Sequence, residues 1–256
     1  MRMRGVPFQT RPQHRPLTPL FVQFPGVHHV DLLESFLKQG VAFDRDVVPS
    51  TDVVDFLRGP VMLSHINTWA IATVGPHNFG TKWYVGRARP EEIVFAIQEE
   101  MIPPGAVPLS VRTALNILKD KLGVAAFGDA TEFTAYDEGS PKHPSWPAMH
   151  SAASAGSLWM AVVMDLTKEQ LCQAKAVDYG VAYARTVAGV HYPSDNIDGL
   201  KLGQEILARK LPEYLAEVYG SDPDEVEAKI AKVRFDWGDF EGSECYLELM
   251  STFSRD

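Results

Sequence analysis

Cysteine is scarce in this chain of 256 residues, which contains only Cys172 and Cys245. Two cysteines cannot build the multi-bridge framework of a small secreted domain, and their separation is not that of a structural metal site. The two could pair with each other, but we expect two buried free thiols, since free cysteine is among the most buried residue types.

Tracts of basic residues and long apolar runs are also missing. The formal net charge of −9 argues against a nucleic-acid-binding protein. The longest uncharged run, Pro144 to Met164, contains a histidine, serines and prolines, so it predicts a buried helix and its approach rather than a membrane span. The first 30 residues contain four arginines but no apolar segment of the kind that a secretory signal requires. We therefore expect no nucleic-acid partner and no membrane span, and the sequence does not assign a compartment.

No stretch alternates apolar and polar residues for long enough to predict a sheet, and no repeat occurs. Apolar residues recur instead at helical spacing. We expect helices at about 30–37, 51–74 with a break at Gly59-Pro60, 91–101, 109–122, 150–164, 168–189, 193–209, 211–218 and 223–233, with loops at 75–81 and 128–147. The sequence predicts an all-α fold, with an irregular arm over residues 1–27 and a single α-helical catalytic domain over 28–256.

The stretch from Ala184 to Asp195 carries the clearest chemical pattern. It contains Arg185, then His191 six residues later, then Asp195 four residues after that, within a Pro-Ser-Asp helix start. An arginine can hold an oxyanion, and a carboxylate can orient an imidazole that acts as a base, nucleophile or ligand. The stretch is therefore a candidate anion-handling site.

A basic stretch precedes the helix expected at 91–101. It contains Lys82, Arg87 and Arg89, and Pro90 follows. A lysine supplies a mobile point charge, whereas an arginine supplies a rigid fork that fits tetrahedral oxyanions. Taken alone, the stretch is more simply explained as a solvated basic turn.

Two histidines, His143 and His150, lie seven residues apart in the sequence His-Pro-Ser-Trp-Pro-Ala-Met-His. His150 leads into a helix of small residues. It is either a core histidine bonded to a backbone carbonyl or a general acid–base group near neutral pH.

Together the three stretches resemble the motifs of the vanadium haloperoxidase and type 2 phosphatidic acid phosphatase superfamily. These motifs are a lysine, six residues and Arg-Pro; then Pro-Ser-Gly-His; then an arginine, five residues, a histidine, three residues and an aspartate. The first motif is matched in full by Lys82, Arg89 and Pro90, and the third by residues 185, 191 and 195. The second is matched in part, as Pro-Ala-Met-His at 147–150. Within the superfamily the chain is most similar to the algal bromoperoxidases, which share the His-Pro-Ser-aromatic-Pro lead at 143–147 and the Ala-Gly-Val-His-Tyr sequence at 188–192.

The resemblance implies a helical bundle that binds vanadate as its cofactor. His191 would be the protein ligand of the vanadium, oriented by Asp195. His150 would act as acid–base on the apical oxygen, and His143 would flank the halide side of the pocket. The other cofactor-binding groups would be three cations and one backbone N–H: Lys82, Arg89, Arg185 and Met149.

The implied activity is the oxidation of a halide, with bromide or iodide favoured, by hydrogen peroxide, and a small organic molecule would accept the halogen. Lys82 would polarise the peroxide. The same residues allow an acid phosphatase, in which His191 attacks phosphorus to form a phosphohistidine and His150 protonates the leaving oxygen. A non-catalytic bundle is disfavoured, because a protein without oxyanion chemistry does not need this set of lysine, arginine and histidine residues. The bromoperoxidases that the chain resembles commonly assemble through helical faces, so a homo-oligomer is also expected.

The chain departs from the second motif at two positions. Ala148 replaces a serine that hydrogen-bonds an oxyanion oxygen, a loss of roughly 1.5–3 kcal/mol of anion binding. Met149 replaces a glycine, so its side chain must turn away from the pocket. Ser145 and Ser151 are the candidates to replace the lost hydroxyl.

Overall fold

The computed structural model describes residues 27–48, 55–128, 133–136 and 139–253. These residues form helices joined by loops, and their one strand-like contact is an isolated bridge between Phe43 and Met164. The all-α prediction is confirmed. The arm expected over residues 1–27 lies outside the described residues except for its last residue, which begins the first described helix. A single catalytic domain over 28–256 stays a prediction.

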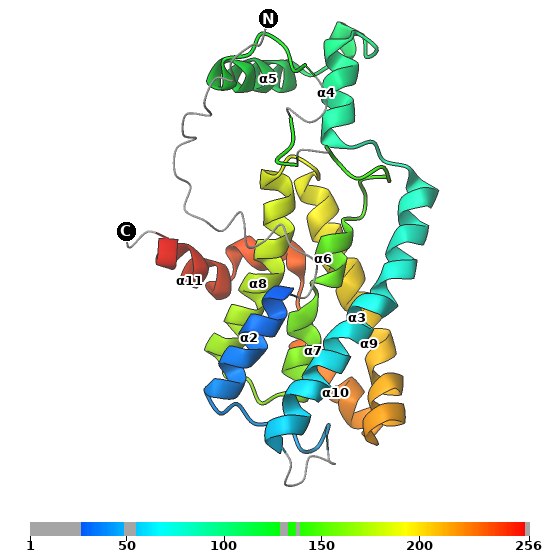
Figure 1. Ribbon diagram of the computed structural model, residues 1–256, viewed down its shortest axis with the longest axis vertical. Coiled ribbons are helices and arrows are strands. Elements are labelled where there is room, and N and C mark those ends of the chain that lie inside the picture. Colours follow the sequence, from blue (N-terminus) through cyan, green and yellow to red (C-terminus); the bar gives the residue numbers. More distant parts are fainter. Residues whose placement is uncertain (1–26, 49–54, 129–132, 137–138, 254–256) are drawn as a thin grey trace, which may run out of the picture.

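The bundle is formed by helices that pack along their lengths (Figure 1). Its members are α2 (Val27–Lys38), α3 (Asp55–Val85), α6 (Met149–Ala153), α7 (Gly156–Val163), α8 (Lys168–Val187), α9 (Pro193–Tyr219) and α10 (Pro223–Val233). The core between them includes fully buried Phe36, Ile66, Trp159 and Leu211. Burial of such side chains stabilises a fold by about 1.5–3 kcal/mol each before entropy costs, so this core fixes how the helices cross. No helix in the described part of the chain is both long and apolar enough to span a membrane, as the sequence predicts.

Two helices, α4 (Pro90–Gln98) and α5 (Leu109–Leu122), lie beyond one end of the bundle (Figure 1). The bounds of α5 agree with the sequence prediction, and its end is set by Gly123, whose φ of 68° suits glycine. None of its residues is buried, and Leu109 and Ile117 are among its exposed apolar side chains. The expected homo-oligomer stays a prediction.

Helix α3 contradicts the predicted break at Gly59-Pro60 and the predicted loop at 75–81, because it is continuous from residue 55 to 85 through two prolines. Proline costs a helix about 3 kcal/mol, so tertiary contacts must offset it. Val74, Asn78 and Lys82 follow one another at four-residue spacing and are all fully buried. The last two donate hydrogen bonds to carbonyls of the 144–147 segment. This docking holds the last turns of α3 in helical form.

The division of the chain into helices differs from the prediction at two further places. The helix expected at 150–164 is divided into α6 and α7 at Ser154 and Ala155. The helices expected at 193–209 and 211–218 form one helix, α9, which continues through Pro212. Leu211, Pro212 and Leu215 are buried there, so packing against the core outweighs the loss of one helical hydrogen bond.

The prediction of free thiols is wrong, because Cys172 and Cys245 form a disulfide. It joins the N-terminal part of α8 to the first turn of α11 (Glu244–Phe253), a helix that was not predicted from the sequence. A 3₁₀ turn at Trp237–Gly242 reverses the chain before α11, and its Trp237 and Phe240 are buried in a small aromatic cluster with Tyr179 of α8. This cluster places α11 across α8 and brings the two thiols together.

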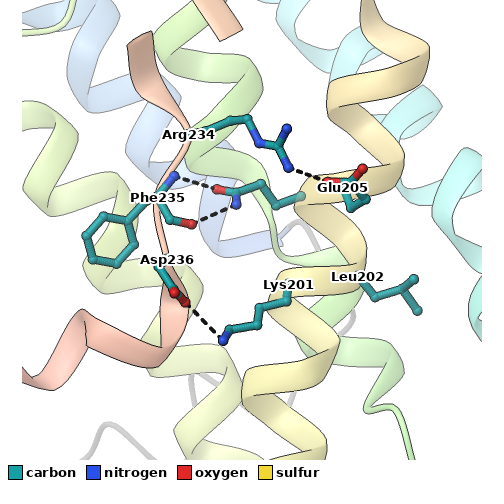
Figure 2. Close-up of a pocket in the computed structure, with 7 residues that line it drawn as sticks. Lys201, Leu202, Glu205, Arg234, Phe235 and Asp236 are labelled. Carbon is teal, nitrogen blue, oxygen red and sulfur yellow. Dashed lines mark hydrogen bonds and ion pairs between the residues drawn. The ribbon is translucent and has the colours of Figure 1, made fainter. Parts of the chain in front are cut away.

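An open depression lies between α9 and the segment 234–236. Figure 2 shows that two ion pairs cross it, Lys201 to Asp236 at 2.9 Å and Arg234 to Glu205. The Gln204 amide also bonds both backbone groups of residue 235. Because these polar groups satisfy one another, the contacts fasten the C-terminal segment to α9.

Candidate active site

The three motifs meet where several helices begin or end. Lys82 lies in the last turn of α3, Arg89 caps α4, and Arg185 lies in the last turn of α8. His150 belongs to the short α6, and His191 precedes α9. Contacts between these segments, described below, place the predicted site residues in one cluster.

The most buried part of the cluster is a set of three cations. Lys82, Arg89 and Arg185 are 0%, 2% and 1% exposed. None of the three side-chain heads contacts a carboxylate within the described residues. Burying a charge without a partner costs several kcal/mol, so three such charges need an anion that the described residues do not provide.

Arg89 is fixed by backbone carbonyls. Its Nε donates to the His143 carbonyl at 2.9 Å, and its Nη1 donates to the Val190 carbonyl at 2.8 Å. The same Nη1 lies 3.4 Å from Nε2 of His191. The guanidinium is therefore rigid and directed at the imidazole nitrogen that the third motif presents.

The Lys82 ammonium is also held by carbonyls, at 3.0 Å from Pro144 O and 2.8 Å from Ser145 O. These two bonds use two of its three hydrogens. The pKa of Lys82 is lowered to about 7, chiefly by burial; the charges of Arg89 and Arg185 contribute to the decrease and that of Asp195 opposes it. A bound anion would restore the full charge.

His191 is oriented through its other nitrogen. Nδ1 lies 3.1 Å from the Asp195 carboxylate, so a hydrogen on Nδ1 leaves the Nε2 lone pair facing Arg89. The pKa of His191 is lowered to about 3, chiefly by burial. The hydrogen bond to Asp195 acts to raise this pKa, whereas the charges of Arg89 and Lys82 act to lower it. The imidazole is neutral near neutral pH and able to act as a nucleophile or a ligand.

Asp195 is fully buried and hydrogen-bonded at both oxygens. One oxygen accepts from Ser145 and the Tyr192 backbone beside His191, and the other accepts from Arg87 at 2.6 Å. Burial raises the pKa of this carboxyl, but the bonds from His191, Ser145 and Tyr192 bring it below its ordinary value. Asp195 therefore stays ionised and keeps His191 in one tautomer.

Arg87 is the site residue that the sequence analysis missed, because it was assigned to a solvated turn. Its guanidinium also donates to Ser194 at 2.9 Å and lies 4.3 Å from the centre of the Tyr192 ring. Its side chain is 38% exposed, so it covers the outer side of Asp195. Its position two residues before Arg89 was visible in the sequence, but its partner was not.

His150 faces the same charges. Burial lowers its pKa to about 3, with Arg185, His191, Lys82 and Arg89 all acting in the same direction. Its imidazole makes no hydrogen bond within the described part of the chain, so it is free to exchange a proton with a bound molecule. The neighbouring Met149 directs its methyl group toward Gly75 of α3.

His143 lies at the edge of the cluster. Its Nδ1 is 3.2 Å from Nη2 of Arg89, and its ring packs edge-to-face on Phe79 with 5.2 Å between ring centres. Burial lowers the pKa of His143, and the Arg89 charge adds to this shift. The His143 imidazole thus lies beside the Arg89 guanidinium and is itself packed on a phenyl ring.

Neither serine candidate replaces the hydroxyl that Ala148 lacks. Ser145 donates to the Asp195 carboxylate and lies 3.3 Å from Nδ1 of His191, on the side away from the cations. Ser151 donates to Asn196 at 3.0 Å and is fully buried. Both hydroxyl groups maintain the structure around the site.

Comparison with known proteins agrees with this arrangement. The profile described as PAP2 superfamily matches residues 62–208, which include every predicted site residue. Searches of curated proteins and of solved structures give no match to this chain. The matched segment is more than half of the sequence and contains all three motifs, and on that basis the chain belongs to the PAP2 superfamily.

Proposed function

We propose that this protein is a vanadate-dependent haloperoxidase that oxidises bromide or iodide with hydrogen peroxide. The observation that carries the proposal is the set of three buried cations, which have no contacting carboxylate among the described residues, together with the Nε2 of His191 that Arg89 approaches at 3.4 Å. Such a set compensates a tetrahedral oxyanion with a charge of two or three.

The donor set fits vanadate. Buried Nε of Arg185 has no hydrogen-bond partner among the described residues, and Nε2 of His191 has only the 3.4 Å approach of Arg89. We assign Lys82, Arg89 and Arg185 to the oxyanion oxygens and His191 to the vanadium, with the Met149 N–H as a further donor. When bound, vanadate supplies a Lewis-acidic centre that activates hydrogen peroxide toward a halide.

The chain supplies the proton transfers and the charge. His150 makes no hydrogen bond among the described residues, and the negative charge of a bound oxyanion would raise its low pKa, so it can take a proton from hydrogen peroxide as the peroxide binds. Lys82, held by two carbonyls, places its remaining hydrogen toward the reacting oxygen and stabilises the charge that develops on it. Asp195 keeps His191 in the tautomer that presents Nε2.

The halide side of the site is assigned to His143. Its ring lies beside the Arg89 guanidinium and packs edge-to-face on Phe79. A large, polarisable anion such as bromide or iodide is easily dehydrated, so it suits a cation flanked by aromatic rings. A small organic molecule then accepts the oxidised halogen.

An acid phosphatase is the second candidate, and the geometry of His191 favours it. Its Nε2 has the position and the neutral state of a nucleophile for phosphorus, with Arg89 next to it. His150 would then protonate the leaving oxygen, and the same cations would stabilise the transition state.

One set of assays separates the two activities. Purified protein loaded with orthovanadate is tested for peroxide-dependent bromination and iodination of a dye, and vanadate-free protein is tested for hydrolysis of an aryl phosphate. We expect halogenation that requires vanadate; hydrolysis without halogenation would select the phosphatase, and loss of both would reject the oxyanion chemistry. His191→Ala should abolish the activity, whereas His65→Ala, an exposed histidine of α3, should preserve it.

Ala148→Ser tests the altered second motif. A hydroxyl at this position is predicted to tighten vanadate binding by about tenfold, in line with one added hydrogen bond to a charged group. Equilibrium dialysis against orthovanadate measures the change, and an unchanged dissociation constant would remove residue 148 from the site.

A further inference from the structure

A loop outside the three motifs, residues 133–136, reaches the cation cluster. Residues 133–136 pack against the end of α8, where the Ala135 N–H donates to the Ala188 carbonyl at 2.9 Å. Gly189 makes this contact possible, because a Cβ there would lie 2.8 Å from the Phe133 carbonyl oxygen, and its φ of 74° also suits glycine. Thr134 is buried beside them. The loop is thus anchored immediately before Tyr136.

Tyr136 approaches Arg185 from this loop. Its phenolic oxygen accepts a hydrogen bond from Nη1 of Arg185, whose Cζ lies 5.1 Å from the centre of the tyrosine ring. The backbone N–H of Tyr136 bonds to the Thr134 hydroxyl at 3.3 Å, and that hydroxyl donates to the Tyr136 carbonyl at 3.1 Å. The Thr134 hydroxyl therefore fixes the backbone of Tyr136 at both its N–H and its carbonyl, and so positions the phenol on the guanidinium.

The phenolic hydrogen has no acceptor among the residues that the structure describes. Arg185 donates to the oxygen, so the O–H itself is still available as a donor. An oxyanion bound to the same guanidinium would lie next to this O–H, because two acceptors on one arginine fork are neighbours. A phenol polarised by a cation is also a stronger donor than a free one.

We propose that Tyr136 donates a hydrogen bond to the oxyanion held by Arg185, and so supplies the hydroxyl that is missing at Ala148. The inference rests on the proposed function, because it requires an oxyanion in the cluster. The inference goes beyond the proposed function because it assigns a binding role to a residue outside the three motifs. Ser145 and Ser151 do not compete for this role, since both donate to other side chains.

The test is oxyanion binding by Tyr136→Phe, measured with orthovanadate and with inorganic phosphate by isothermal titration calorimetry. This change removes the hydroxyl and keeps the ring against Arg185. The dissociation constants for both anions should rise about tenfold, as expected for one hydrogen bond to a charged group. The matched control is Tyr84→Phe, because Tyr84 in the last turn of α3 is 90% exposed; this change should alter neither constant by more than about twofold.

The outcomes separate this inference from the proposed function. If wild-type protein binds the anions and Tyr136→Phe binds them equally well, Tyr136 has no part in binding and only this inference fails. Tighter binding by Tyr136→Phe would also overturn it, since the phenol would then obstruct the site. If wild-type protein binds neither anion, both proposals fail.

Discussion

The buried ammonium of Lys82 should make the stability of the ligand-free protein depend on pH. Its pKa falls from an ordinary 10.5 to about 7, chiefly because it is buried, and Arg89 and Arg185 add to the shift. In the unfolded chain the same lysine keeps its proton to far higher pH. The unfolded state therefore binds more protons than the folded state between these two pKa values, so stability must rise with pH in that window.

The size of the effect follows from the two pKa values. Each unit of difference corresponds to about 1.4 kcal/mol, so the full shift is on the order of 5 kcal/mol, reached above the unfolded pKa. Integration from about pH 7 to about pH 9 gives a gain of roughly 2 kcal/mol. Lys82→Met removes the titrating group and keeps the length of the side chain, so the variant should lack this gain.

Urea unfolding followed by tryptophan fluorescence at three pH values in this range measures the difference. The wild-type free energy of unfolding should rise relative to that of Lys82→Met by the stated amount. Lys210→Met, at an exposed lysine of α9, should keep the wild-type pH dependence. Parallel pH profiles for wild type and Lys82→Met would show that the ammonium is not desolvated in the ligand-free site, and would remove the reason given for an anion there.

Three further predictions concern the support of the site. Arg87→Met leaves its buried carboxylate partner without a charge-assisted bond, so vanadate affinity should fall about tenfold and stability by about 1–3 kcal/mol; dialysis and urea unfolding test this, and wild-type values would reject the positioning role. Reduction of the Cys172–Cys245 disulfide, which closes a loop of 73 residues, should lower stability by about 4 kcal/mol and spare anion binding, as measured by calorimetry with and without reductant. In Gly203→Ala the new Cβ would lie 2.0 Å from a carbonyl oxygen of α6, so both melting temperature and anion affinity should fall, whereas Gly80→Ala, with open space around it, should not lower either.

The helical content could be predicted from sequence because it depends on local periodicity. The apolar spacing of α5 and the proline and glutamates that open α4 act within a few residues, and both helices occur where they were expected. Boundaries that depend on distant contacts were predicted wrongly. Pro76 predicts an interruption of α3, but the bonds from Asn78 and Lys82 to the 144–147 segment stabilise the helix beyond it. A carbonyl more than sixty residues away leaves no local signal.

The charged residues of the site could also be predicted from the sequence, because residue type and spacing along the chain are enough to recognise the three motifs. By itself the sequence determined an all-α fold and a set of cations, histidines and one carboxylate suited to an oxyanion. Only the tertiary structure decided which groups touch. It turned Arg87 from a solvated residue into the partner of Asp195, engaged Ser145 and Ser151 elsewhere, joined the two cysteines, and brought Tyr136 onto Arg185. These contacts depend on where loops and helix ends meet after packing, which no short-range pattern encodes.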